Sequence, residues 1–214
     1  NFDLDEIHSI ENTSVIPNYF KKDKDFIKGA SLLENCIKNK QLICIFGDYD
    51  VDGIASTSLL AKFFDYIKHP YFFYIPDRER DGYGPSIKLF KKLILKKPQL
   101  IIMLDCGSTS NDAVNYLNEN KIKSLIIDHH EINKPFPKAN SIINPKKDNG
   151  YLEYNYLCAT ALTYFFLDLL SQKIQSKIKI SNLLIYVLLA TVCDVMPLRK
   201  LNRQIAITAL KDFD

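Results

Sequence analysis

The sequence predicts an α/β fold, a doubly wound and mainly parallel sheet flanked by helices, with a helical portion at its C-terminal end. Four apolar runs of four or five residues alternate with helical segments between residues 23 and 127. Continuous apolar strands are typical of a parallel sheet buried on both faces, and right-handed crossovers place helices on each face. After residue 145 only helical periodicity remains.

Each element follows from its own pattern. Residues 23–39 form the opening helix because Phe26, Ala30 and Leu33 fall on one face. The apolar runs predict strands at residues 42–46, 71–75, 100–104 and 124–127. Helices are predicted at residues 54–68, 85–96, 110–120, 157–170, 181–192 and 202–213. Pro85 is expected at the first position of its helix.

The chain divides into an N-terminal extension, residues 1–22, and one catalytic domain, residues 23–214. Its 214 residues are enough for a full core, and 47% hydrophobic residues is ordinary for a globular protein. A net charge of +3 is too weak to indicate nucleic acid by itself. Because the chain starts with Asn1 and stops within a helical pattern, we expect a piece of a longer protein.

Several classes of protein are disfavoured. The five cysteines are widely spaced without a CxxC pair, which fits reduced thiols in the cytoplasm. No signal peptide is visible at the N-terminus. The most apolar stretch, residues 183–196, is too short to cross a bilayer and contains Asp194. We therefore expect a cytoplasmic protein without a membrane segment.

Acidic and histidine residues follow three of the four predicted strands. Ligands of parallel sheets bind beyond the carboxyl ends of the strands. Carboxylates gathered there cannot all stay ionised without a cation, and a mixed carboxylate and imidazole set suits Mn²⁺ or Mg²⁺. The residues concerned are Asp48, Asp50 and Asp52 after the first strand, Asp105 after the third, and Asp128, His129 and His130 after the fourth.

Each group also has a purely structural interpretation. The loop of residues 47–53 could be a solvated turn, and Asp105 or the histidines could cap helices. Asp194 is the only charge between residues 183 and 198, and a buried lone carboxylate must be paired or metal-bound. A helix cap or an ion pair with Arg199 is the alternative there. The agreement of three strand ends on one sheet edge favours the metal site.

The motifs Gly47–Gly53, Asp105-Cys106-Gly107, Asp128-His129-His130 and Asp194-Val195 resemble those of the DHH phosphoesterases. The loop of residues 76–84, with Arg78, Arg80 and Tyr83, is similar to the signature of the RecJ-type exonucleases, and so are Asn144-Pro145 and Asn202-Arg203. The resemblance extends from about residue 17 to the end.

The resemblance implies hydrolysis assisted by two divalent cations, Mn²⁺ or Mg²⁺, and a role for each residue. One ion would be held by Asp48, Asp50 and Asp105, and the other by Asp52, Asp105, His129 and Asp194. His130 would face the scissile phosphate, and Asp128 would orient the imidazoles. Arg78 and Arg80 would grip a neighbouring phosphate, while Tyr83 would either stack on a base or pack.

The implied activity is 5′→3′ exonuclease action on single-stranded DNA in repair and recombination. Implied partners are single-stranded-DNA-binding protein and a RecQ-type helicase, and we expect a monomer. The family also carries DHHA1 and OB-fold domains, so this stretch alone is expected to bind metal but to digest DNA weakly or not at all. The alternatives are a DHH enzyme acting on cyclic dinucleotides, short oligonucleotides or pyrophosphate, and a non-catalytic scaffold.

Two positions depart from the family pattern. Phe46 stands where many DHH enzymes have a histidine, which makes Asp48 the expected substitute ligand. Residues 158–161 replace a glycine-rich turn with bulkier side chains, which argues against a backbone contact to phosphate there.

Overall fold

The computed structural model describes residues 16–147 and 152–211. Most of the predicted extension, residues 1–22, and the end of the helix predicted to residue 213 therefore lie outside the described residues. The described part begins with a 3-10 helix, η1 (Tyr19–Lys22), whose start is capped by the side chain of Asn18.

The centre of the molecule is a five-stranded parallel sheet in the order β2-β1-β3-β4-β5. The strands are β1 (Ile43–Gly47), β2 (Tyr71–Tyr74), β3 (Leu100–Leu104), β4 (Lys123–Ile127) and β5 (Ser141–Ile143). The predicted parallel sheet is confirmed. Three residues are too few to show a strand pattern, so β5 was not predicted. The strand order reverses between β1 and β3, where such sheets bind ligands.

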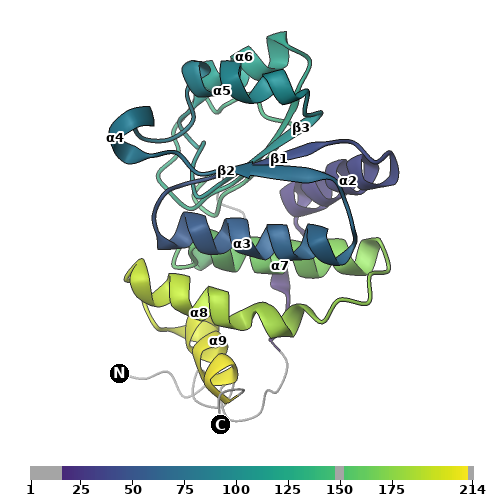
Figure 1. Cartoon of the computed structure of the whole chain (residues 1–214). Helices are drawn as coiled ribbons and strands as arrows, with labels where there is room; N and C mark the ends of the chain where they lie inside the picture. Colours follow the sequence, from purple (N-terminus) through teal and green to yellow (C-terminus); the bar gives the residue numbers. More distant parts are fainter. Residues whose placement is uncertain (1–15, 148–151, 212–214) are drawn as a thin grey trace.

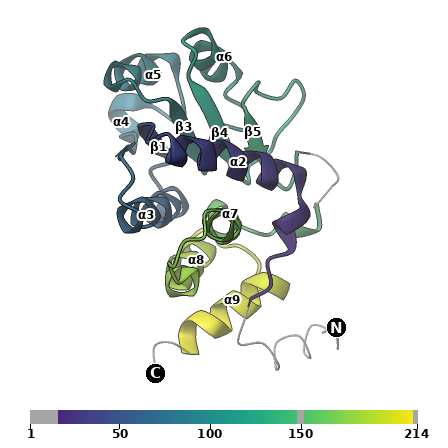
Figure 2. The same ribbon diagram turned by 90° about the vertical axis from the view of Figure 1, so that its right-hand side faces the viewer.

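Helices cover both faces of the sheet (Figures 1 and 2). One face carries α2 (Lys24–Lys38), α3 (Val51–Tyr66) and α7 (Ala159–Lys173); the other carries α5 (Ile87–Leu93), η2 (Ile94–Lys96) and α6 (Asn111–Glu119). Beyond α3 and α7 lie α8 (Leu184–Cys193) and α9 (Lys200–Lys211). The short elements are α4 (Arg78–Asp81), η3 (Leu152–Tyr154) and η4 (Ile180–Leu183). No helix among the described residues is long and apolar enough to span a membrane.

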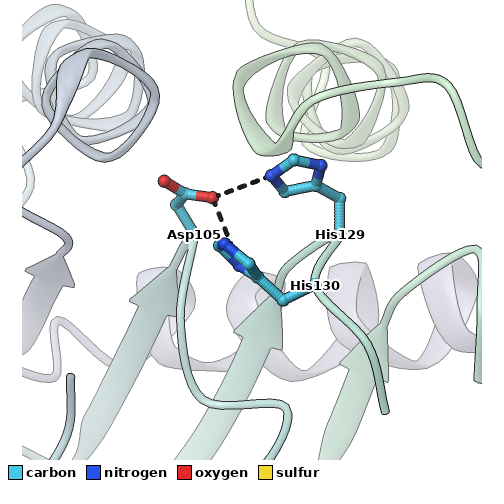
Figure 3. Close-up of side chains that lie close together, drawn as sticks. All are labelled: Asp105, His129 and His130. Carbon is cyan, nitrogen blue, oxygen red and sulfur yellow. Dashed lines mark ion pairs between the residues drawn. The ribbon is translucent and has the colours of Figure 1, made fainter. Parts of the chain in front are cut away.

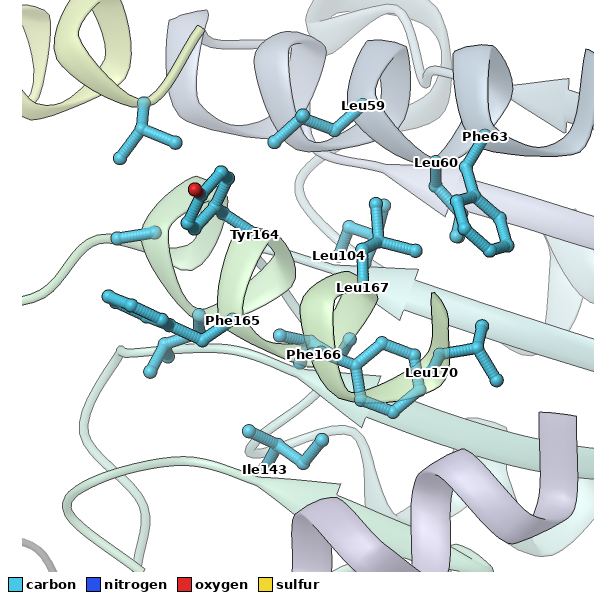
Figure 4. Packing of buried hydrophobic residues seen from close by; sticks show 14 of the residues in the cluster. Leu59, Leu60, Phe63, Leu104, Ile143, Tyr164, Phe165, Phe166, Leu167 and Leu170 are labelled. Carbon is cyan, nitrogen blue, oxygen red and sulfur yellow. The ribbon is translucent and has the colours of Figure 1, made fainter. Parts of the chain in front are cut away.

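Alternate side chains of each strand enter two separate cores. In β1, Ile43 and Ile45 join the core under α2, α3 and α7, whereas Cys44 and Phe46 join the core under α5 and α6. Figure 4 shows the larger core, where α3 and α7 meet over the sheet. Because β1 and β3 are buried on both faces, they are apolar throughout, which is the pattern that predicted them, whereas the edge strand β2 is apolar but only partly buried.

Several boundaries differ from the prediction because side chains cap the helices. The α3 helix begins at Val51 rather than residue 54, since the Asp50 carboxylate accepts a hydrogen bond from the Gly53 amide (2.9 Å). The α5 helix is capped by Ser86, so Pro85 precedes it instead of opening it. The loop predicted at residues 76–84 contains the short helix α4.

Two glycines let the start of α3 approach β1 closely. A Cβ atom at Gly53 would lie 2.4 Å from the Asp48 carbonyl oxygen, and one at Gly47 would lie 2.1 Å from the Thr57 hydroxyl. The turn between β1 and α3 therefore needs glycine at both positions, and this close packing holds Asp48 in place.

We expect Gly53→Ala to lower the free energy of unfolding by about 1–3 kcal/mol, because the new methyl group meets backbone atoms that cannot move aside. Helix propensity alone predicts the opposite sign, since alanine is favoured over glycine by about 1 kcal/mol. Urea denaturation followed by circular dichroism measures the change.

Gly29→Ala in α2 is the matched control. Its Cβ would meet only side-chain ends, Leu125 Cδ1 at 3.1 Å and Phe166 Cε2 at 3.2 Å. We expect a smaller loss of stability than at Gly53, and an equal or larger loss would contradict the proposed backbone conflict.

Candidate metal centre

The carboxyl edge of the sheet gathers the predicted acids and histidines. Asp48 follows β1, Asp105 follows β3, and Asp128, His129 and His130 follow β4. Asp50 caps α3 and Asp52 lies in its first turn. Asp194, the C-cap of α8, reaches the same place from the helical portion. The structure therefore brings together all eight residues.

Their oxygen and nitrogen atoms form overlapping groups in which every pair lies within 4.8 Å. One group contains Asp48, Asp50 and Asp105, and a second contains Asp52, His129 and Asp194. His129 joins the two, because its Nε2 lies 3.3 Å from Asp105 Oδ1, 3.5 Å from Asp194 Oδ2 and 3.7 Å from Asp52 Oδ2. A third group adds His130 to Asp105 and His129.

Asp105 lies at the centre of this arrangement, beside both imidazoles (Figure 3). Its side chain is fully buried, and neither carboxylate oxygen has a hydrogen-bond partner within the part of the chain that the structure describes. Burial, together with the charges of Asp52, Asp50 and Asp128, raises its pKa to about 12. Its backbone also has a φ of 60°, in the left-handed region that non-glycine residues rarely adopt.

Asp194 and Asp48 are held in a similar electrostatic environment. Burial raises the pKa of both carboxyl groups, and nearby aspartates raise it further. The buried Oδ2 of Asp194 also has no hydrogen-bond partner among the described residues. Oxygen atoms without partners, next to imidazole nitrogens and without thiolates, fit a hard divalent cation such as Mn²⁺ or Mg²⁺.

The amino end of α7 fixes Asp52. The two Asp52 carboxylate oxygens accept hydrogen bonds from the backbone amides of Ala159 (2.7 Å) and Thr160 (2.8 Å), and the Thr160 hydroxyl donates to the Asp52 carbonyl (3.0 Å). These amides belong to the segment where the family has a glycine-rich turn. Here they bind an aspartate of the chain itself.

Asp128 and His130 form a separate pair beside Asp105. His130 Nδ1 lies 2.8 Å from Asp128 Oδ1, which also accepts hydrogen bonds from the amides of His129 and His130. Burial opposes ionisation of Asp128, but the hydrogen bonds and charge of His130 outweigh it and lower the pKa of Asp128 to about 2. The same partner raises the pKa of His130. Asp128 is thus ionised and holds the imidazole by one nitrogen.

Of the predicted substrate residues, Arg78 and Arg80 lie on the short helix α4, and Tyr83 follows it. The Arg78 guanidinium is 5.5 Å from the centre of the Tyr49 ring, and Tyr83 meets the same ring edge-on at 6.4 Å. Arg80 is exposed on the same short helix, α4. The loop is anchored because the Tyr74 hydroxyl donates to Asp81 (2.5 Å).

A cleft of about 650 Å³ opens beside this centre. Tyr83 and the start of α5 line it, as do Asp128, His130 and the loop between β3 and α6. Ser108 also lines the cleft, Tyr49 contacts Arg78 and Tyr83, and Asn144 donates a hydrogen bond to Ser108. The sequence did not single out these three as site residues. Only Asn144 left a sequence signal, its asparagine-proline pair.

Phe46 is not part of the centre. It is fully buried and packs between the rings of Tyr74 and Phe90, so it belongs to the core under α5. The position that carries a histidine in many DHH enzymes therefore supplies no ligand, and Asp48, two residues later, lies with Asp50 and Asp105 instead.

Comparison with known proteins identifies relatives of this fold and site. The chain is 29% identical over 199 residues to the single-stranded-DNA-specific exonuclease RecJ of Bacillus subtilis, covering 89% of the chain and 25% of that protein. It is 30% identical over 192 residues to RecJ of Haemophilus influenzae, covering 86% of the chain and 33% of that protein. The chain thus spans a quarter to a third of these relatives.

Solved structures agree in fold. A crystal structure of exonuclease RecJ bound to manganese superposes with a TM-score of 0.80 at 24% identity, covering 88% of this chain and 48% of that one. RecJ from Thermus thermophilus in complex with Mn²⁺ gives 0.77 at 22% identity, covering 94% and 29%.

The model of the DHH family, N-terminal domain, matches residues 42–191. This range contains the whole sheet and all the clustered acids except Asp194. The chain belongs to the DHH family.

Proposed function

We propose that this chain is the catalytic DHH domain of an exonuclease that degrades single-stranded DNA from its 5′ end, using two divalent cations, in DNA repair and recombination. The observation that carries the proposal is the buried Asp105 carboxylate, which has no hydrogen-bond partner among the described residues and lies within reach of two groups of further ligands. The activity for which the relatives are named, single-stranded-DNA-specific exonuclease, supplies the substrate class.

Asp48, Asp50 and Asp105 would hold one cation, and Asp52, Asp105, His129 and Asp194 would hold the second. When bound, such a pair of cations makes water nucleophilic near neutral pH and neutralises charge on the phosphate. The protein contributes the spacing: Asp105 is shared because it follows the central strand β3, between the loops of β1 and β4. The carboxylate charges are offset only when the cations are present.

His130 would face a non-bridging phosphate oxygen. Since Nδ1 is engaged by Asp128, the other ring nitrogen, Nε2, is left to donate a hydrogen bond to the substrate. Asp128 keeps the imidazole in one tautomer and orientation, and its negative charge favours the cationic form that binds phosphate best.

Arg78 and Arg80 would hold a phosphate next to the one that is cut, and Tyr83 would stack on a base at the mouth of the cleft. The contact with Tyr49 restricts the Arg78 side chain before DNA binds, which lowers the entropy lost on binding. The interacting partners expected for such an enzyme remain single-stranded-DNA-binding protein and a RecQ-type helicase.

Asp105→Asn tests the role of the buried carboxylate, first in the metal-free protein. A raised folded-state pKa means that stability is present below the unfolded pKa and is lost as pH rises above it. The metal-free wild type should therefore lose stability from about pH 4 upward, and Asp105→Asn should be more stable than the wild type at pH 7. Thermal denaturation between pH 4 and 8 measures this.

With Mn²⁺ present, the wild type should be more stable than Asp105→Asn. At a concentration 100 times the Kd, binding stabilises the wild type by about 2.7 kcal/mol, whereas Asp105→Asn should gain little. Asp65→Asn, which changes an exposed acid near the far end of α3, is the control and should respond to Mn²⁺ like the wild type. Equal stabilisation of Asp105→Asn would contradict the proposed shared ligand.

The choice of substrate and of the end attacked distinguishes this activity from the alternatives. With Mn²⁺ and the full-length protein, 5′-labelled single strands should release labelled mononucleotide at once, whereas 3′-labelled strands should shorten gradually. Faster hydrolysis of dinucleotides or pyrophosphate would favour another DHH phosphoesterase. If isothermal titration calorimetry detects no Mn²⁺ binding, the result would favour a non-catalytic scaffold.

Arg78 is tested as a contact to a DNA phosphate. Arg78→Ala should raise KM for single strands and reduce the slope of log KM against log salt by about 0.7, the expected loss for one phosphate contact on a single strand. Arg199→Ala is the matched control because its guanidinium lies 4.9 Å from the Tyr156 ring, so the variant loses the same kind of cation–π contact elsewhere. If both variants change the salt slope equally, Arg78 has no special role.

A further inference from the structure

Asn144, which directly follows β5, completes a closed ring of hydrogen bonds beside the metal centre. Its Nδ2 donates to the His130 carbonyl (2.9 Å) and to the Ser108 hydroxyl (2.8 Å). The Ser108 amide donates to Asp128 Oδ2 (3.0 Å), and Asp128 Oδ1 binds His130 through its amide and Nδ1. Four residues from three loops are thus joined in a cycle.

The ring is buried, so its hydrogen bonds are not exchanged for water. Asn144 is 1% exposed, Ser108 2% and Asp128 1%. The side-chain acceptor of Asn144, its Oδ1, accepts a hydrogen bond from the Lys146 amide (2.9 Å). Asn144 therefore uses both amide donors and its acceptor, and an aliphatic side chain there would leave the His130 carbonyl and the Ser108 hydroxyl without this donor.

His130 is the one member of this ring of hydrogen bonds that is open to the cleft. The His130 side chain is 43% exposed, while its ring nitrogen and its backbone are held by the buried members. An imidazole that is fixed through both its ring and its main chain has little freedom to turn, whereas one fixed only at Nδ1 could move with its loop.

We propose that Asn144 and Ser108 are positioning residues, which hold the His130 main chain and the Asp128 carboxylate so that the imidazole faces the scissile phosphate. This inference rests on the proposed function, because the role of His130 in that function is itself a proposal. Asn144 and Ser108 are buried, although Ser108 lines the cleft, and in this proposal both act through His130 and Asp128.

The test compares Asn144→Ala and Ser108→Ala with the wild type, all in the full-length protein, because this stretch alone is expected to digest DNA weakly or not at all. We expect kcat on single strands to fall about 10- to 100-fold for Asn144→Ala, with the Mn²⁺ Kd within a factor of two of the wild type. Ser108→Ala keeps the amide that binds Asp128 and loses only the hydroxyl. Its kcat should therefore lie between those of the wild type and Asn144→Ala, and the variant remains informative if Asn144→Ala folds poorly.

Asn18→Ala is the matched control. Asn18 also donates two side-chain hydrogen bonds, to the Phe165 carbonyl and the Asp168 carboxylate (both 2.9 Å), and accepts one from the Phe20 amide two residues later. It joins η1 to α7 outside the ring. The variant should lose stability, as Asn144→Ala does, without losing kcat. A parallel fall of kcat in both variants would mean that the effect is only structural.

A double-mutant cycle tests whether Asn144 acts through His130. The variant His130→Ala/Asn144→Ala should be no slower than His130→Ala alone, because positioning has no effect once the imidazole is gone. If Asn144→Ala costs the same factor in both backgrounds, or if it abolishes Mn²⁺ binding, the inference is overturned.

Nuclear magnetic resonance tests the positioning without turnover. The chain has four histidines, so the imidazole ¹⁵N signals of His130 can be assigned with His130→Ala. Those signals should shift in Asn144→Ala and Ser108→Ala and stay unchanged in Asn18→Ala; unchanged signals in all three would overturn the inference. Absence of hydrolysis by the wild-type full-length protein would instead overturn the proposed function alone.

Discussion

The constraint on which the structure depends is a buried carboxylate that has no hydrogen-bond partner among the described residues. Asp105 emerges from the central strand with both oxygens shielded from water, three aspartates nearby and a left-handed backbone. Charge in such a place is expensive unless a cation offsets it. Sites of strain and unpaired polarity concentrate where function requires them, and here they coincide at the point where the strand order reverses.

The rest of the fold supplies the supports for this point. Close packing at Gly47 and Gly53 brings the β1 loop against the start of α3, which places Asp48, Asp50 and Asp52 on one side. The amino end of α7 binds Asp52 from the other side, where backbone amides and the helix dipole favour a negative charge. Thus a helix from the C-terminal half stabilises an acid from the first motif.

The two histidines of one motif have different surroundings. His129 is buried among Asp52, Asp105 and Asp194. His130 is half-exposed at the cleft and is tied to Asp128. Adjacent residues that leave a strand point in different directions, so one sequence motif provides one imidazole among the buried acids and one at the cleft.

The sequence by itself determined the layered α/β fold and most of the candidate centre. Apolar runs mark strands buried on both faces, and acids at strand ends must meet at one edge, so local patterns were sufficient for β1 to β4 and for Asp48, Asp105 and His129. Tertiary structure alone decided what surrounds them. Asn144 lies 36 residues from Ser108, and Asp52 lies 107 residues from Ala159.

These partners carry no periodic or spacing signal, because a side-chain hydrogen bond depends on where loops meet in space. The same holds for β5, whose three residues form a strand only because β4 offers an edge to pair with, and for the contact between Arg78 and Tyr49. Sequence predicted which groups gather at the carboxyl edge of the sheet; the packing of distant loops and helix ends decided how each one is held.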